Sequence, residues 1–259
     1  MGHVTIEIAE GIATLWLDRP DRHNAFDDEL IRELTGAIDS LAKDRAVRVV
    51  ILAGKGKSFS AGADLGWMRR MASASEAENE KDAAGLAELM HRLNGLAKPT
   101  IALVQGAALG GGVGLVAACD LAIAATDAVF SLSEVRLGLI PSVISPYVIA
   151  AIGARAARRY FLTAERFDAA TAARLGLVQA IVAADQLWPE GTKLAGLLVQ
   201  NPPLAMAEAK RLIADVAGRP IDAALRGETA RRIAKLRAGA EACEGVSAFL
   251  EKRKPRWPV

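Results

Sequence analysis

Three consecutive glycines between two apolar segments form the part of the chain best suited to chemistry. Gly110, Gly111 and Gly112 follow the apolar run 101–104 and open the stretch VGLVAAC, which has a helical pattern. A strand, a glycine turn and a helix start leave backbone N–H groups without partners at the positive end of a helix dipole. Such a point can stabilise a developing oxyanion. Glu134, if the chain folds back onto this point, would supply a carboxyl group for proton transfer.

The hydrophobic pattern predicts the elements that position these residues. Alternation predicts a hairpin from segments 4–8 and 12–17, followed by a helix that begins near Asn24 or Asp27 and runs to Leu41. Apolar runs predict strands at 47–52, 101–104, 121–125 and 129–131. Between them lies the glycine-containing loop 53–64, and Asp64 is a suitable N-cap for a short helix at 65–71. This order of strands and helices predicts an α/β fold.

The second half of the chain becomes increasingly helical. Segment 73–97 is amphipathic, and its polar start, 73–82, fits either a mobile lid or a solvated helix face. Pro146 breaks the apolar run 143–152, and helices are predicted at 154–162 and 168–175, with a strand at 177–182. Four more helices are expected at 185–200, 204–217, 220–238 and 240–250. A boundary near Asn201 would separate a core, 1–200, from a helical C-terminal region, 201–259.

Composition excludes several classes of protein. The 259 residues are 52% hydrophobic and 24% charged, which is typical of a globular enzyme. A net charge of +2 argues against a nucleic-acid or membrane partner. The uncharged stretch 99–119 contains glycines and Gln105, which favour a buried strand and helix over a membrane span. Two distant cysteines and the absence of a signal-peptide pattern predict a cytoplasmic protein.

No pattern of metal or cofactor binding accompanies the glycines. The three histidines, His3, His23 and His91, are scattered, so we expect no metal site. The sequence GGGVG lacks the spacing of a dinucleotide fingerprint, and there is no phosphate-binding loop motif. We therefore expect no separate cofactor.

Four motifs in the same order resemble the enoyl-CoA hydratase/isomerase (crotonase) family. They are LDRPDRHNAF at 17–26, FSAGADL at 59–65, ALGGGVGLVAACDLAIA at 108–124, and FSLSEVRLGLIP at 130–141 followed by ISPYVI. The chain looks most similar to bacterial members of the methylglutaconyl-CoA hydratase kind. The resemblance implies a crotonase-like ββα spiral core and a helical C-terminal trimerisation region. It also implies an acyl-CoA substrate, with CoA as part of that substrate, and a homotrimer or a dimer of trimers.

The resemblance also implies roles for individual residues. The N–H groups of Ala63 and Gly111 would hold the thioester oxygen, and Glu134 would be the general acid/base. The first of two glutamates common in family hydratases falls on Gly114, which cannot transfer a proton and would leave space for a bulkier or branched acyl group. The substrate would further contact Arg22, Ala61, Asp64, Leu65, Gly110, Gly114 and Pro141. The CoA phosphates and ribose would meet Arg19, Arg22, Lys55 and Lys57.

Three functions are compatible with these residues. The first is enoyl-CoA hydration, in which Glu134 moves protons to and from water and the C2 atom. The second is enoyl-CoA isomerisation, in which one glutamate moves a proton between C2 and C4; Gly114 favours this alternative. The third is a non-catalytic acyl-CoA or RNA-binding scaffold, in which Glu134 would only pair with Arg136 or cap a helix. The near-neutral charge argues against RNA.

Overall fold

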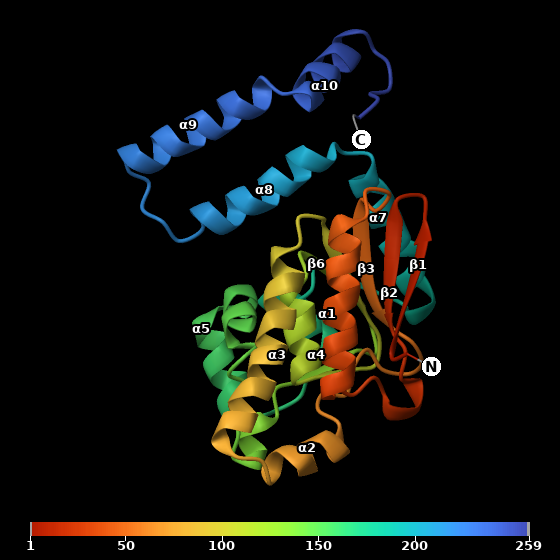
Figure 1. Cartoon of the computed structure of the whole chain (residues 1–259), viewed down its shortest axis with the longest axis vertical. Helices are drawn as coiled ribbons and strands as arrows, with labels where there is room; N and C mark the ends of the chain where they lie inside the picture. Colours follow the sequence, from red (N-terminus) through yellow and green to blue (C-terminus); the bar gives the residue numbers. More distant parts are fainter. Residues whose placement is uncertain (1, 258–259) are drawn as a thin grey trace.

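A computed structural model describes residues 2–257 and has the predicted α/β architecture (Figure 1). The first part of the chain forms β1 (Val4–Ala9), β2 (Ile12–Leu17), η1 (Pro20–Arg22), α1 (Asp28–Lys43), β3 (Val49–Gly54), α2 (Leu65–Ala72), α3 (Glu76–Gly95), β4 (Thr100–Val104), β5 (Ala107–Leu109) and α4 (Gly111–Ala118). The rest forms β6 (Leu121–Ala125), β7 (Val129–Ser131), η2 (Glu134–Leu137), α5 (Ser145–Thr163), β8 (Phe167–Asp168), α6 (Ala169–Leu175), β9 (Ala180–Val182), η3 (Ala184–Gln186), α7 (Leu187–Val199), α8 (Pro203–Val216), α9 (Ala223–Arg237) and α10 (Ala240–Leu250).

The main sheet has six strands in the order β1-β2-β3-β4-β6-β9. Only the β1–β2 hairpin is antiparallel, and every other neighbouring pair is parallel. All residues of β3 and β4 are buried because helices cover both faces of the sheet. Apolar residues of α1, α3 and α4 pack on one face, and those of α7 pack on the other (Figure 1).

A second, small sheet joins β5, β7 and β8. Strands β5 and β7 run parallel, with Leu109 opposite Ser131. Parallel strands end at the same edge, so the residues that follow them, Gly110 and those of η2, emerge side by side. This sheet therefore brings the glycine turn and the Glu134 segment together.

Most predicted element starts are confirmed by side-chain caps. Asp27 accepts from the Leu30 N–H at 2.9 Å at the start of α1, and Asp64 caps α2. The polar stretch 73–82 includes the start of α3, where Ser75 and Glu78 form a reciprocal capping box.

Two predictions need adjustment. The predicted helix 154–162 is present as the second part of α5, which follows a kink at Gly153 with φ 74°. Residues 145–152, which the prediction left outside this helix, are also helical, because Pro146 lies in the first turn, where the missing N–H costs nothing. The predicted strand 177–182 is shorter, since only Ala180–Val182 pair with β6.

Helices α8, α9 and α10 project from the rest of the chain (Figure 1). After residue 200, Leu225 and Ala248 are the buried apolar side chains within the described part of the chain. Helix α8 is tied to the sheet by Lys210, whose Nζ lies 2.8 Å from an Asp120 carboxylate oxygen. The same oxygen accepts hydrogen bonds from the N–H and hydroxyl of Thr100, so Asp120 has a structural role. Residues 258 and 259 of the predicted C-terminal region lie outside the described residues.

The two cysteines differ sharply in environment. Cys119, at the end of α4, is buried, and this burial, with a smaller effect of Asp120, raises the pKa of its thiol to about 12. Cys243 is exposed on α10. Both are thiols without a disulfide partner. Among residues 2–257, no helix combines the length and apolar character that crossing a membrane requires.

Gly106 lies between β4 and β5, at the point where the loop that follows β3 packs most closely against the chain. Its φ is +56°, and a methyl group there would overlap the carbonyl oxygen of Lys57. We predict that Gly106→Ala lowers the free energy of unfolding by about 2–4 kcal/mol, since left-handed backbone strain and overpacking add. Urea denaturation measures this change.

Gly196 provides the matched control. It lies inside α7 with no atom within 4 Å of a built methyl group. Gly196→Ala should raise the free energy of unfolding by about 0.5–1 kcal/mol, because alanine favours the helix. Equal effects of the two substitutions would contradict this account of the Gly106 crossing.

Candidate active site

The segment 60–63 lies between Phe26 and the chain around β5. Ser60 pairs in parallel with Ala108, and Ala63 pairs in parallel with Phe26. The Phe26 N–H donates to the Gly62 carbonyl at 2.7 Å, and the Asp64 N–H donates to the Phe26 carbonyl at 2.7 Å. The groups on either side of Ala63 thus point to Phe26. Because N–H directions alternate along an extended chain, the Ala63 N–H points the opposite way, toward the β5 side.

The pairing of Ser60 with Ala108 brings the segment that leads to Ala63 beside the segment that leads to Gly111. Gly62 lies close to the end of β5, since a methyl group on it would be 3.1 Å from the Leu109 carbonyl oxygen. Within residues 2–257, neither the Ala63 N–H nor the Gly111 N–H donates a hydrogen bond to the protein. Gly111 is also the first residue of α4, at the positive end of its dipole. The structure therefore brings the two predicted donors together.

Glu134 lies against the same turn. The Gly110 N–H donates to the Ser131 carbonyl at 2.9 Å, which holds the glycine turn to β7. A methyl group on Gly110 would be 3.1 Å from Oε1 of Glu134, so only a glycine leaves room for the carboxyl group there. Gly110 also has φ +50°, in the region that favours glycine. The predicted fold-back of the Glu134 segment onto the glycines is present.

The Glu134 carboxyl is half-buried and incompletely paired. Its Oε2 atom is inaccessible to water and has no hydrogen-bond partner among residues 2–257. Burial raises the pKa of the carboxyl, and the hydrogen bond from its own N–H offsets only part of this effect. The alternative of an ion pair with Arg136 is wrong, because no such pair forms between these described residues. A carboxyl group with a raised pKa and an unused oxygen is suited to proton transfer.

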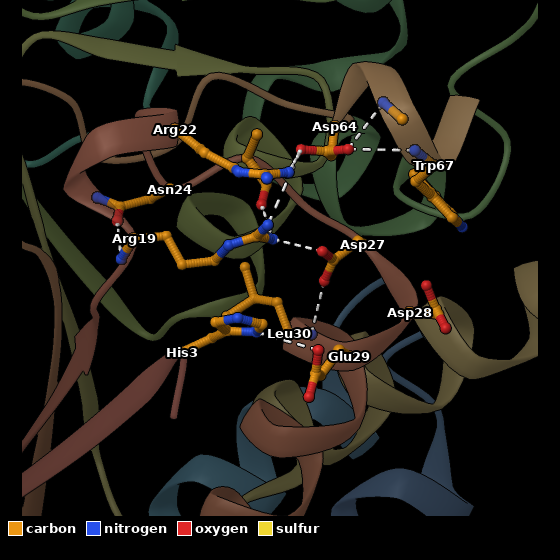
Figure 2. A network of polar contacts seen from close by, with 12 residues as sticks. His3, Arg19, Arg22, Asn24, Asp27, Asp28, Glu29, Leu30, Asp64 and Trp67 are labelled. Carbon is orange, nitrogen blue, oxygen red and sulfur yellow. Dashed lines mark hydrogen bonds and ion pairs between the residues drawn. The ribbon is translucent and has the colours of Figure 1, made fainter. Parts of the chain in front are cut away.

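A network of buried ion pairs lies beside the donor segment, as we call residues 60–63, and includes Asp64, which follows it (Figure 2). Arg19 is 6% exposed and lies 2.7 Å from Asp27 and 3.8 Å from Asp64. Arg22 approaches Asp64 from the surface, with an N–O distance of 3.0 Å. Burial alone would raise the pKa of Asp64. Hydrogen bonds from Trp67 N–H, the Arg22 guanidinium and Gly66 N–H outweigh it and hold the pKa below its usual value.

The predicted CoA-binding cations divide into two groups. Arg19 is a correction: its guanidinium is occupied by Asp27, Asp64 and the Ala25 carbonyl at 3.0 Å, so it cannot contact a phosphate. Lys55 pairs with Asp18 at 2.7 Å. Arg22 and Lys57 are exposed.

The remaining predicted substrate contacts differ in their exposure to solvent. Leu65 is 72% exposed at the start of α2, immediately after Asp64, and Ala61 is partly exposed. Pro141 is buried in the connection between η2 and α5. Leu65 is therefore available to a ligand at the surface, whereas Pro141 shapes the connection.

Gly114 requires a second correction, because the space beside it is occupied. A methyl group on Gly114 would overlap Cγ2 of Ile144, and would lie 2.8 Å from Cβ of Ile144 and 3.2 Å from Cε of Met90. Both neighbours are buried. The predicted room for a bulkier or branched acyl group is filled by the protein itself.

Sequence reasoning missed Phe26 and Ile144. The ring of Phe26 packs against Gly111, 3.3 Å from a built methyl group, and its backbone pairs with Ala63. Phe26 ends the motif at 17–26, which was the available signal. Ile144 lies in an apolar run and carries no comparable signal.

The histidines do not gather at this site. His23 contacts the Ser58 hydroxyl at 3.1 Å, and His3 lies beside Glu29 and Glu33 of α1. The His3 N–H donates to Glu33 at 2.6 Å, so this contact fastens the start of the chain to α1.

Comparison with known proteins agrees with this geometry. A family model for enoyl-CoA hydratase/isomerase matches residues 7–258. The crotonyl-CoA hydratase of Syntrophomonas wolfei is 35% identical over 255 residues, which cover 97% of this chain and 96% of that protein. The mitochondrial Delta(3,5)-Delta(2,4)-dienoyl-CoA isomerase of Dictyostelium discoideum is 34% identical, with coverage of 94% and 86%. The crystal structure of an enoyl-CoA hydratase from Shewanella pealeana is 45% identical, covers 98% of this chain and 96% of that one, and has a TM-score of 0.96. This likeness confirms the predicted crotonase-like fold.

The unpaired carboxyl of Glu134 predicts a pH-dependent cost in stability. Its pKa in the folded state lies above that of an ordinary glutamate side chain, so the folded state holds the proton more tightly than the unfolded state. The free energy of unfolding is then highest at pH values below the pKa of the unfolded state. It falls as the pH rises through the pKa of the folded state. We predict that Glu134→Gln removes this fall. The gain in free energy of unfolding over wild type should grow as the pH rises above the range in which an ordinary glutamate side chain titrates, and then level off.

Asp64→Asn is the matched control, with the opposite sign. The pKa of Asp64 is lower in the folded state than in the unfolded state, so its ionised form stabilises the fold at pH values above the pKa of the unfolded state. This contribution disappears as the pH falls through the pKa of the folded state. This variant should be less stable than wild type at neutral pH, with a difference that shrinks in acid. Chemical denaturation at a series of pH values measures the free energy of unfolding of both variants. If this free energy depends on pH in the same way in wild type and in Glu134→Gln, burial does not raise the pKa of Glu134.

Proposed function

The chain belongs to the enoyl-CoA hydratase/isomerase family, and on this premise we propose that it adds water across the 2,3 double bond of an enoyl-CoA thioester. The observation that carries the proposal is the buried, unpaired Oε2 of Glu134 beside Gly110 and the two unused N–H groups. CoA is the carrier half of the substrate, and no separate cofactor takes part.

In this reaction the N–H groups of Ala63 and Gly111 hold the thioester oxygen. Electrons of the double bond move toward that oxygen as water attacks C3, and an enolate forms. Two backbone donors oppose the charge that develops there, each contributing about 3 kcal/mol to the stability of the transition state. Small residues suit these positions because the backbone makes the contact.

Glu134 begins ionised and takes a proton from the attacking water as the new C3–O bond forms. It then delivers a proton to C2 as the enolate collapses, which regenerates the carboxylate. One group serves both steps because the oxygen and the proton arrive on the same face of the double bond. The raised pKa of Glu134 favours this exchange, since a group that titrates closer to neutrality both accepts and donates protons readily.

Isomerisation is the second candidate. It needs a single carboxyl group to move a proton between C2 and C4, and the family includes the Dictyostelium dienoyl-CoA isomerase. Hydration is favoured here by the similarity to crotonyl-CoA hydratase at slightly higher coverage. A non-catalytic scaffold would have no use for a buried carboxyl group that weakens the fold.

The same geometry supports a proposal for the preferred acyl group and for the residues that bind CoA. A branched or glutaconyl-type acyl group was expected from space at Gly114, and that basis is lost because Ile144 occupies the space. We propose short linear enoyl groups instead. Exposed Arg22 and Lys57 are the cations available to the CoA phosphates. Arg22 lies 3.0 Å from Asp64, which follows Ala63, and Lys57 lies three residues before segment 60–63 in the sequence.

We further propose that 1–200 is the catalytic core and that 201–259 assembles a homotrimer or a dimer of trimers. Apolar side chains on α8 to α10 support this, because a single chain leaves them in water; they include Ile213, Ile221, Phe249 and Leu250. Two surface clefts, of about 760 and 530 Å³, are lined by residues other than Glu134, Ala63 and Gly111. We propose that a neighbouring subunit contributes to the acyl chamber. The two thiols without disulfides support a cytoplasmic location.

We predict that the purified protein lowers the absorbance of the conjugated thioester in crotonyl-CoA and forms the 3-hydroxyacyl product. A branched 2-enoyl-CoA should react more slowly. A rise in absorbance with a 3-enoyl-CoA, and no hydroxyacyl product from any 2-enoyl-CoA, would establish isomerisation instead.

Glu134→Gln is the control for this assay. It preserves shape but cannot transfer a proton, so turnover should fall by at least about a thousandfold while the Kd for butyryl-CoA changes by no more than about threefold. Activity within tenfold of wild type would remove Glu134 from the mechanism.

We predict that light scattering reports three or six chains at micromolar concentration. Phe249→Asp should weaken assembly, since it places a charge on an apolar side chain that is 82% exposed in one chain. Lys252→Asp, at an exposed polar position just beyond α10, is the control. A wild-type monomer would disprove the assembly proposal.

A further inference from the structure

The face of α4 that Glu134 covers at Gly110 continues for one more turn to Gly114. The Gly114 N–H donates to the Gly110 carbonyl at 3.2 Å, so the two glycines lie one above the other on the helix. Glu134 covers Gly110, and Ile144 covers Gly114. Since one helical turn rises about 5.4 Å, the side chain of Ile144 begins about that far from the carboxyl group along the helix axis.

Ile144 is held firmly in this place. It is 3% exposed and forms the N-cap residue of α5, ten positions after Glu134. Its Cγ2 atom fills the position that a side chain at Gly114 would take, and Met90 of α3 closes the same space from the other side. Glycine at 114 is therefore required by the close approach of Ile144, and no open volume separates them.

Phe26 blocks the chamber on the other side of the donors. Its ring packs on Gly111, and its side chain is 2% exposed. An acyl chain whose thioester oxygen lies at the Ala63 and Gly111 N–H groups, with C2 and C3 below Glu134, meets apolar walls at Phe26 and at Ile144. Of these two, Ile144 lies further along α4, because it contacts Gly114 whereas Phe26 contacts Gly111. An acyl chain that runs along α4 from Gly111 would therefore place the carbons beyond C3 toward Ile144.

We propose that Ile144 is a specificity-determining residue that closes the acyl chamber one helical turn beyond Glu134 and restricts the substrate to short acyl chains. This inference rests on the proposed function for its reacting group, but it concerns the size of the acyl site. Binding of unreactive saturated acyl-CoA molecules therefore tests it independently of turnover.

The experiment compares the dissociation constants of butyryl-CoA and octanoyl-CoA by calorimetry, in wild type and in Ile144→Ala. Wild type should bind butyryl-CoA more tightly. Ile144→Ala should shift the ratio toward octanoyl-CoA by about tenfold or more, in the range that pocket methylenes produce. An unchanged ratio would overturn the proposal, as would a wild type that binds octanoyl-CoA as tightly as butyryl-CoA.

Ile152→Ala is the matched control. Ile152 is a buried isoleucine on the same helix, 7% exposed, and it lies two turns beyond Ile144. Its truncation should cost comparable stability and leave the ratio of the two constants unchanged. If Ile144→Ala fails to fold, Ile144→Val removes one methyl group and should shift the ratio in the same direction by a smaller factor.

A double variant tests the packing itself. Gly114→Ala should lower the melting temperature, because its methyl group overlaps Cγ2 of Ile144, and adding Ile144→Ala should restore part of the loss. Strict additivity of the two losses would show that Ile144 does not fill this space. If the binding ratio shifts as expected while no enoyl-CoA is hydrated, the proposed function fails and the acyl-site assignment stands.

Discussion

The parallel pairing of short chain segments around β5 is the constraint on which the site depends. Ser60 pairs with Ala108 and Ala63 pairs with Phe26, while β7 pairs with β5 on its other side. None of these contacts involves a long strand, yet each fixes a register, and in parallel pairing a shift by one residue would turn every N–H to the wrong side. Ala63, Gly111 and Glu134 meet because three segments end at the same edge. The large sheet and its helices provide the rigid support for this edge.

Two carboxyl groups near the donors show how environment separates their roles. Asp64 accepts hydrogen bonds from two backbone N–H groups and from the Arg22 guanidinium, which together outweigh burial and keep its pKa low. Arg19 lies 3.8 Å away on the buried side, so Asp64 is a fixed anchor. Glu134 has one oxygen without a partner, and burial raises its pKa. The same side-chain chemistry thus gives a structural charge at one position and a proton carrier at the other. The carrier weakens the fold, as unpaired buried groups at functional sites do.

The sequence predicted features that depend on local chemistry. The caps at Asp27 and Asp64 and the glycine turn at 110–112 follow from residue type and spacing, and the expected fold-back of Glu134 onto this turn is present. The two backbone donors were implied by motif resemblance, and their role stays a prediction. Features that depend on a distant neighbour could not be predicted. Gly114 alone suggested empty space, and only the packing of α5 on α4 shows that Ile144 fills it. Arg19 and Arg22 are three positions apart, yet the fold buries one and exposes the other.

The contrast between the two thiols has a practical consequence for observing assembly. Burial keeps Cys119 protonated and shielded, whereas Cys243 is exposed on α10, within the region that leaves the core. A maleimide dye therefore has one reactive attachment point in the natural sequence, and that point lies on the helices that would meet another subunit. Fluorescence anisotropy or energy transfer from this label would report association in real time, without an engineered cysteine.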